Sequence, residues 1–184
     1  MDICAYQGEP GAFSEQAARR LLGAAVPLLP CADFPALFRA VDRARVRWAV
    51  VPIENTLAGP VTECQAWLKR AQIESVGDLR LPIRLALIAA AGVTLADIRR
   101  VYSHPMALPQ CRKFFAAHPW MSALPARDTA GAVRELLQGD ARDAAAIAGT
   151  HCAELYGGKL VADDIGDSSE NYTRFLLVSP ARER

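Results

Sequence analysis

The sequence lacks the features that mark membrane proteins, nucleic-acid-binding proteins and exported proteins. Its longest apolar run, from Leu85 to Val93, is far shorter than the ~20 residues that a membrane-spanning helix needs. The formal net charge is only +1, and no basic stripe is present that would bind nucleic acid. The stretch from Met1 to Cys4 has no basic leader of the kind that directs secretion. These absences predict a cytoplasmic enzyme or binding protein with neither a membrane nor a nucleic-acid partner.

Cysteine and histidine are few and scattered, which argues against a metal or redox site. The cysteines include no Cys-x-x-Cys pair, and the histidines stand at no metal-ligand spacing from them. Because free cysteine is commonly buried, we expect reduced thiols in the core, no metal and no cofactor. The residues concerned are Cys4, Cys31, Cys64, Cys111 and Cys152, with His104, His118 and His151.

Short apolar runs alternate with amphipathic helical stretches along the whole chain. This alternation is typical of an α/β fold with mostly parallel sheets. The predicted strands are residues 3–6, 26–31, 48–53, 101–102, 122–125 and 144–148. The predicted helices are residues 13–22, 35–45, 61–71, 108–117, 130–137 and 151–156.

Two stretches, residues 73–91 and 160–178, break this alternation because they are extended and poor in helix signals. If both cross between lobes, the chain forms two α/β lobes. The first lobe would hold about residues 1–78 with 165–184, and the second about residues 79–164. A cleft between lobes joined in this way is a natural ligand site with a hinge. A single doubly wound sheet is the alternative.

Four predicted strand-to-helix turns carry small hydroxyl, amide or carboxylate residues. In parallel α/β sheets, ligands bind beyond the carboxyl ends of the strands, where helix N-termini point at them. Each turn alone is explained by helix capping, but four together favour a site for a small carboxylate. The spacing of Gly8 and Gly11 matches neither the dinucleotide fingerprint nor the P-loop. The turns are residues 8–14, 54–56, 103–105 and 128–130.

Near its end the chain places an amide, a hydroxyl, a guanidinium and an aromatic ring within five residues, from Asn171 to Phe175. At the start of a strand, Thr173 and Phe175 would share one face and Arg174 would lie on the other, unless the preceding turn twists them together. This set of groups predicts a grip on a small anion together with one donated hydrogen bond.

These motifs, in this order, resemble the catalytic domain of prephenate dehydratase over essentially the whole chain. Residues 6–15 are similar to the opening glycine-rich turn of that family, and residues 51–59 to its second motif. The run from Tyr102 to Pro105, continuing to Gln110 and Cys111, is similar to the third. Residues 128–130 follow, and residues 171–175 close the set.

The resemblance implies a periplasmic-binding-protein-like (type II) pair of lobes and a cofactor-free reaction. In that reaction prephenate loses carbon dioxide and its ring hydroxyl, giving phenylpyruvate on the route to phenylalanine. The resemblance assigns Thr173 as the catalytic hydroxyl that assists departure of the ring hydroxyl. The alternative for Thr173 is a hydroxyl that bonds to backbone at a strand start. The expected substrate-binding residues are Asn55, Thr56, Ser103, Gln110, Thr129, Arg174 and Phe175.

Arg174 is the best candidate for the anchor of one substrate carboxylate, because its planar guanidinium pairs bidentately with carboxylates. The sequence departs from the family pattern at Ala12, where many relatives carry Thr. It stops at Arg184, so we expect no ACT regulatory domain, no chorismate mutase domain and no inhibition by phenylalanine through this chain. A homodimer is expected, since a symmetric pair is the commonest assembly.

Three other functions remain open on the sequence alone. The first is dehydration of arogenate, the transaminated relative of prephenate. The second is a non-aromatising prephenate decarboxylase, but such enzymes resemble the family while lacking the acid at the position of Thr173. The third is a non-catalytic anion-binding module built on the same scaffold.

Overall fold

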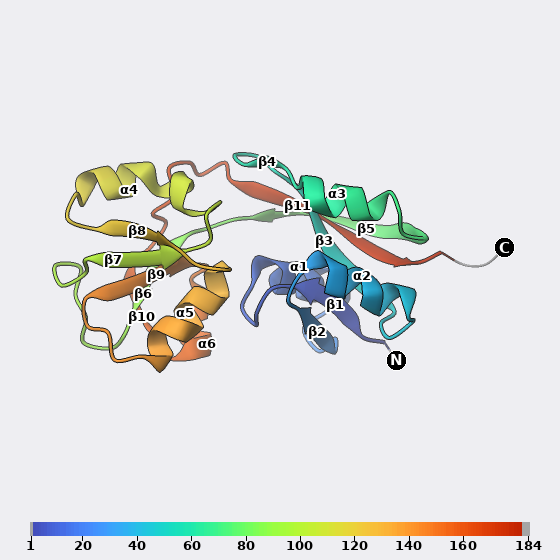
Figure 1. The fold of residues 1–184 in the computed structure, drawn as a ribbon, viewed down its shortest axis with the longest axis horizontal. Coiled ribbons are helices and arrows are strands. Elements are labelled where there is room, and N and C mark those ends of the chain that lie inside the picture. Colours follow the sequence, from blue (N-terminus) through green and yellow to red (C-terminus); the bar gives the residue numbers. More distant parts are fainter. Residues whose placement is uncertain (1, 182–184) are drawn as a thin grey trace. The chain divides into compact units, whose positions relative to one another are not determined.

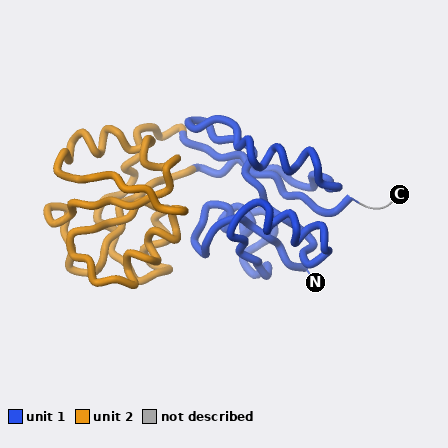
Figure 2. Tube along the Cα trace, in the orientation of Figure 1, with its two compact units in different colours: residues 1–82, 171–184 blue, residues 83–170 orange. Residues whose placement is uncertain are grey.

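The computed structural model describes residues 2–181, and the chain folds into two compact units (Figure 2). The first unit holds residues 1–82 and 171–184, and the second holds residues 83–170. The chain therefore enters the second unit once and returns once. Both changes of unit fall a few residues later than the bounds expected from the sequence.

The first unit is built on a mixed sheet with the strand order β2-β1-β3-β11-β5 (Figure 1). Strands β1, β2 and β3 are parallel, whereas β11 runs antiparallel to both of its neighbours, β3 and β5. A two-residue strand, β4, pairs with the end of β3. The bounds are β1 Cys4–Gln7, β2 Leu28–Cys31, β3 Trp48–Asn55, β4 Gly59–Pro60, β5 Ile73–Pro82 and β11 Tyr172–Pro180.

Three helices cover the two faces of this sheet: α1 (Phe13–Leu22), α2 (Phe34–Asp42) and α3 (Thr62–Leu68). The core between the sheet and helices α2 and α3 includes Phe38, stacked on Trp67 at 5.6 Å, and Val178 of β11. Helix α1 packs on the opposite face, where Leu21 and Leu177 approach Gly77. Because side chains alternate along a strand, Thr173 and Phe175 share the face of Leu177.

The second unit is a five-stranded sheet with the order β10-β6-β9-β7-β8, in which β9 pairs parallel with β7 and antiparallel with β6. The central strand β9 is wholly buried, and α5 and α6 pack with it around one core. The strands are β6 Ala86–Ala89, β7 Arg100–Ser103, β8 Ser122–Pro125, β9 Ala144–Ala148 and β10 Lys159–Ala162. The helices are η1 Leu108–Cys111, α4 Arg112–Ala117, α5 Thr129–Gln138 and α6 His151–Tyr156.

The α/β class predicted from the sequence is confirmed, but the sheets are mixed rather than mostly parallel. Strands β5 and β6 follow each other without a crossover helix, as do β10 and β11. Each of these two connections passes from one sheet to the other, and all four strands pair antiparallel with their neighbours. The prediction of mostly parallel sheets was wrong for these four strands, where strands no longer alternate with helices.

The helix predicted over residues 108–117 is divided into a 3-10 turn, η1, and the helix α4. The backbone amides of Arg112 and Lys113 donate to the carboxylate of Asp167, at 3.0 and 2.9 Å. A distant loop thus caps α4 at its first residues. A local sequence pattern carries no information about such a cap.

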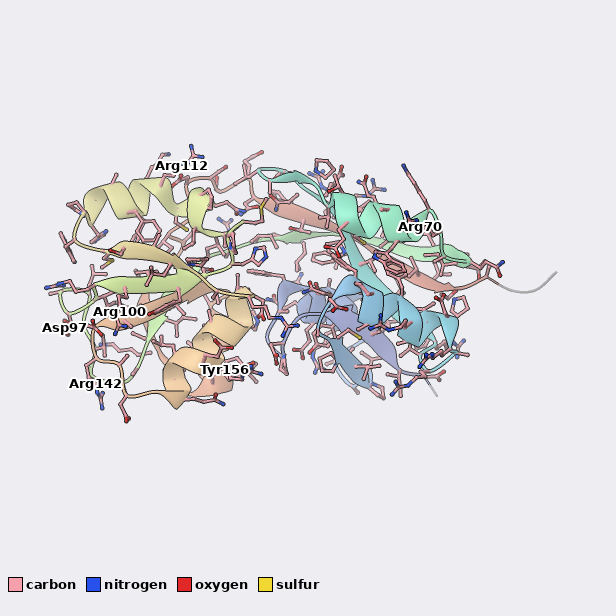
Figure 3. All side chains as sticks on the ribbon, in the orientation of Figure 1. Arg70, Asp97, Arg100, Arg112, Arg142 and Tyr156 are labelled. Atoms are coloured by element: carbon pink, nitrogen blue, oxygen red, sulfur yellow. The ribbon has the colours of Figure 1, made fainter. Side chains whose placement is uncertain are left out.

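Polar groups lie largely on the outside of both units. Arg70, Arg100, Arg112 and Arg142 are exposed and project from their units (Figure 3). All five cysteines are buried free thiols, which confirms that prediction. Residues 2–181 bring together no group of three or more His, Cys, Asp or Glu side chains that could hold a metal ion. None of the helices described there is long and apolar enough to cross a membrane.

Candidate active site

The side-chain amide of Asn55 connects the ends of two neighbouring strands in the first unit. Asn55 is the last residue of β3 and pairs with Thr173, the second residue of β11. Its Nδ2 donates to Thr173 Oγ1 at 2.9 Å, to Asn171 Oδ1 at 2.8 Å and to the carbonyl oxygen of Tyr172 at 3.1 Å. Asn171 is itself only 3% exposed. The amide therefore fixes the Thr173 hydroxyl from one side.

The same asparagine shapes the turn that follows β3. Its Oδ1 accepts from the backbone amides of Leu57 and Ala58, each at 2.9 Å. Thr56 adds a second link to β11, because its backbone amide donates to the Tyr172 carbonyl at 2.9 Å and its hydroxyl accepts from the Tyr172 amide at 3.0 Å. Asn55 and Thr56 together hold the start of β11 against the end of β3.

The half-buried hydroxyl of Thr173 is bonded to a side-chain amide rather than to backbone. Its oxygen is the acceptor in that bond, so its own proton can be donated to a second partner. A donor bonded to the oxygen also polarises the O–H group, because hydrogen bonds in a chain strengthen one another. The geometry is that of an oriented proton donor.

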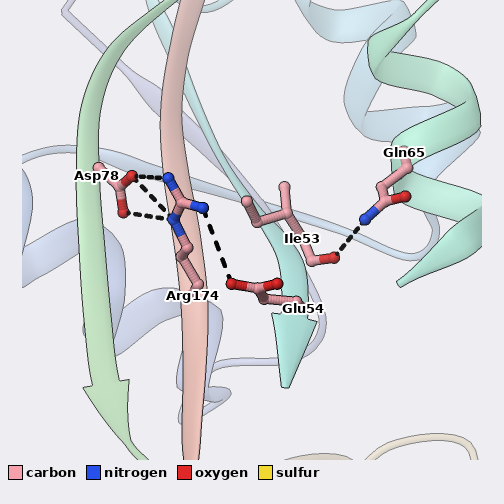
Figure 4. A network of polar contacts seen from close by, with 5 residues as sticks. All are labelled: Ile53, Glu54, Gln65, Asp78 and Arg174. Atoms are coloured by element: carbon pink, nitrogen blue, oxygen red, sulfur yellow. Dashed lines mark hydrogen bonds and ion pairs between the residues drawn. The ribbon is translucent and has the colours of Figure 1, made fainter. Parts of the chain in front are cut away.

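Arg174 and Phe175 continue β11 in two different environments. Phe175 is 2% exposed and belongs to the core of the first unit. Arg174 projects from the face opposite Thr173, where its Nε donates to Asp78 Oδ2 at 2.9 Å and its Nη1 lies 3.8 Å from Glu54 Oε1 (Figure 4). The hydrogen bonds from Arg174 hold the pKa of Asp78 below its ordinary value.

The glycine-rich turn before α1 takes a shape that only glycine adopts easily. Gly8 and Gly11 have φ values of +116° and +88°, and a Cβ atom on Gly8 would lie 2.9 Å from the Cβ of Ala12. The backbone amide of Gly11 donates to the carboxylate of Glu15 at 2.6 Å. That amide, at the N-terminus of α1, is thus already paired within the free protein.

In the second unit, two of the predicted residues lie at the carboxyl end of β7 or just beyond it. Ser103 is fully buried and its hydroxyl donates to the Ile147 carbonyl at 2.7 Å. Gln110, half-buried in η1, donates through Nε2 to the Met106 carbonyl at 2.7 Å. Ser103 therefore joins β7 to β9, and Gln110 closes the turn that follows β7.

Thr129 is the first residue of α5, and its neighbour Asp128 caps that helix by accepting from the Gly131 amide at 2.6 Å. Capping, the alternative considered for each turn, is therefore the role of Asp128. We expect Asp128→Ala to lower stability by about 1 kcal/mol, which corresponds to an apparent Tm about 2–4 °C lower. Differential scanning calorimetry measures this.

The exposed Asp140, two residues after the end of α5, offers a matched control for this cap. Asp140→Ala is expected to leave the Tm within about 1 °C, since surface substitutions away from such features change little. Equal shifts for the two variants would contradict the capping role.

His104 is a functional candidate that the sequence reasoning set aside. Its Nδ1 accepts from the backbone amide of Met106 at 3.1 Å, which leaves the proton on Nε2. Burial lowers the pKa of His104, while the nearby Asp128 opposes that shift. His104 is therefore a neutral hydrogen-bond donor just beyond the end of β7. The signal in the sequence was the turn over residues 103–105, in which His104 follows Ser103.

The fold defines a class of two-unit α/β proteins to which periplasmic binding proteins also belong. A nutrient-binding protein from Burkholderia cenocepacia, solved with bound methionine, matches over 98% of this chain and 85% of its own. Its TM-score is 0.50 at 13% sequence identity, so the likeness concerns the fold alone.

Within that class, the family model for prephenate dehydratase matches residues 4–183, and the chain belongs to this family. Arogenate dehydratase/prephenate dehydratase 2 of Arabidopsis thaliana is 40% identical over 178 residues, which cover 95% of this chain. The solved prephenate dehydratase of Arthrobacter aurescens is 32% identical with a TM-score of 0.91, over 98% of this chain. A structure described as GqqA, a novel type of quorum quenching acylase, is 33% identical with a TM-score of 0.87, over 99% of this chain.

The chain spans less than two thirds of the length of these relatives. The matched part is 45% of the Arabidopsis protein, 61% of the Arthrobacter chain and 65% of the acylase chain.

Proposed function

We propose that this chain catalyses the decarboxylative dehydration of prephenate, forming phenylpyruvate for the synthesis of phenylalanine. The observation that carries the proposal is the hydroxyl of Thr173, bonded by Asn55 and able to donate its proton. Membership of the prephenate dehydratase family supports a lyase that acts in aromatic amino-acid biosynthesis.

In the proposed reaction, the bond between the ring and its carboxylate breaks and releases carbon dioxide. The electron pair of that bond completes the aromatic ring and expels the ring hydroxyl, which takes a proton from Thr173 and leaves as water. Solvent then returns a proton to Thr173. A weak acid is sufficient, because aromatisation supplies much of the driving force, and such general acid assistance is worth about 10²–10⁴-fold.

The remaining predicted residues differ in what they can contribute. We propose that Gln110 and Thr129, which are partly exposed, contact the substrate, with His104 as a further neutral donor. Ser103 and Phe175 are buried, and we propose that they act by packing beneath the site. The anchoring role of Arg174 and the binding roles of Asn55 and Thr56 stay predictions of the sequence.

Dehydration of arogenate is the second candidate. The Arabidopsis relative is named for both substrates, and Arogenate dehydratase 2 of Petunia hybrida, 40% identical over 178 residues, for arogenate alone. A non-aromatising decarboxylase is disfavoured by the presence of Thr173, and a purely anion-binding module by the oriented proton donor. No observation favours an acylase, since the Ser103 hydroxyl is buried and donates to a carbonyl.

Incubation with prephenate and with arogenate at neutral pH tests the proposal. We expect phenylpyruvate from prephenate, followed by its ultraviolet absorbance, with a higher kcat/KM than for arogenate. Controls without enzyme are needed, because acid alone converts prephenate. Dihydro-hydroxyphenylpyruvate as the product would identify a decarboxylase, and a higher kcat/KM for arogenate would make that the substrate. Binding without turnover of either compound would contradict an enzymatic role.

The cytoplasmic location and the homodimer also stay predictions of the sequence. The Arabidopsis relative is described as chloroplastic, which differs from the cytoplasmic location predicted for this chain.

A further inference from the structure

One guanidinium links three neighbouring strands at the end of the first sheet. Arg174 lies in the middle strand, β11, and both its Nε and Nη2 donate to the carboxylate of Asp78 in β5. On the other side, its Nη1 lies 3.8 Å from Glu54 Oε1 in β3 (Figure 4). We name Asp78, Arg174 and Glu54 the ion-pair clamp.

The clamp stands where a bulge interrupts the pairing of β11 with β3, whereas β11 and β5 pair in regular order from Tyr172 to Leu177. Between Val178 and Phe175, β11 pairs with β3 in regular order, but the register shifts between Phe175 and Arg174. The pairs Arg174–Glu54 and Thr173–Asn55 lie beyond this bulge. A bulge re-aims the residues next to it, and a slip of one residue turns every side chain to the other face. Beyond the bulge, the placement of β11 against β3 therefore depends on only two pairs of residues, and side-chain contacts can strengthen it.

Side-chain contacts reinforce this pairing on both faces of β11. On one face, Asn55 donates to Thr173; on the other, Arg174 contacts Glu54 and Asp78. Arg174 thus points away from the face on which Thr173 would donate its proton, and its guanidinium already has a bidentate carboxylate partner. This arrangement suits a residue that holds neighbouring strands together better than one that binds a substrate carboxylate.

We propose that the ion-pair clamp fixes the register of β11 beyond the bulge and so holds the Thr173 hydroxyl in place, an inference that rests on the proposed function. Asp78 is then a positioning residue for the reaction, and Arg174 acts through Thr173. Nothing in the sequence pattern singles out Asp78, because its partner lies 96 residues away.

The clamp should contribute little to the free energy of unfolding of the first unit. The side chains of Arg174, Asp78 and Glu54 are 42%, 45% and 56% exposed. Exposed ion pairs contribute little to folding, because water and salt screen them. Breaking the clamp should therefore leave the fold intact and change only the placement of Thr173.

The first test is the kinetics of Asp78→Asn, which removes the charge and keeps the size. We expect kcat to fall about tenfold while KM stays within about twofold, because a small misplacement of a reacting group mainly slows the chemical step. Arg174→Ala should behave in the same way, and the double variant should be no slower than Arg174→Ala alone. Glu74→Gln is the matched control: Glu74 is an exposed carboxylate of β5 that contacts Ser179 at the other end of β11, and this change should leave kcat unaltered.

The second test is amide hydrogen exchange, which does not depend on the substrate. The amides of Thr56 and Tyr172 bond across the two strands at this end, and Asp78→Asn should speed their exchange at least fivefold, with the amides of β1 unchanged. Faster exchange in a chain that turns over neither prephenate nor arogenate would leave the clamp standing and remove the proposed function.

Three results would overturn the clamp. Unchanged kcat in Asp78→Asn is the first, and a lower kcat without faster exchange is the second. The third is a KM raised tenfold or more by Arg174→Ala but not by Asp78→Asn, which would make Arg174 an anchor for the substrate carboxylate.

Discussion

Replacing Thr173 by Ala is expected to lower kcat a hundredfold or more while substrate binding stays near normal. The Thr173 hydroxyl accepts from Asn55 and can give its own proton away, and loss of a general acid commonly costs about 10²–10⁴-fold. The hydroxyl should stabilise the transition state more than the bound substrate, so its loss should lower kcat and leave KM nearly unchanged. Steady-state kinetics with prephenate and with arogenate, together with direct binding of prephenate, measures both quantities.

Two further variants separate the hydroxyl from the shape of the side chain. Thr173→Val keeps the branched shape and removes the hydroxyl, so its kcat should match that of the Ala variant. Thr173→Ser keeps a hydroxyl that Asn55 can bond, and its kcat should stay within about tenfold of the original protein. Unchanged turnover in the Ala and Val variants would remove Thr173 from the mechanism.

The second large effect is expected at Asn55, where both activity and stability depend on one side chain. Asn55→Ala removes the donor to Thr173 and Asn171 and the acceptor for Leu57 and Ala58. We expect kcat to fall a hundredfold or more and stability to fall by about 2 kcal/mol, or an apparent Tm about 4–8 °C lower. Kinetics and thermal unfolding monitored by circular dichroism measure these changes.

Asn55→Asp separates the effect on activity from the effect on stability. An aspartate keeps an oxygen for the amides of Leu57 and Ala58, so most of the Tm should be retained. It has no N–H to give to Thr173, and its carboxylate would instead accept the threonine proton that the reaction needs. We therefore expect kcat to fall as far as in Thr173→Ala. An active Asp variant would show that the amide donor is dispensable.

The element pattern of this chain could largely be predicted from its sequence. The helices over residues 13–22 and 151–156 and the strands over residues 122–125 and 144–148 begin and end where the pattern predicts. Such elements depend on local periodicity, on glycine and proline, and on short turns. Where a contact from far along the chain sets the boundary of a helix, as Asp167 does for α4, the predicted start of the helix was wrong.

The candidate site, too, could be predicted from the sequence only in part. Thr173 and Asn55 stand in recognisable motifs, at the start of β11 and the end of β3, and the sequence named both as functional residues. The alternation of side chains also placed Arg174 on the face opposite Thr173 in advance. What the sequence left out was the partner of each group: the donor to the Thr173 hydroxyl, the carbonyl that accepts a hydrogen bond from Ser103, and the carboxylates that hold Arg174.

The sequence by itself determined the α/β class, the order of the elements and the family, because these follow from local patterns and ordered motifs, and it predicts Thr173 as the proton donor. Only the tertiary structure decided that β11 enters the first sheet between β3 and β5, and that Arg174 lies between Asp78 and Glu54. Pairing between residues about a hundred positions apart is set by packing and hydrogen bonding of the whole sheet, which no local stretch of sequence encodes.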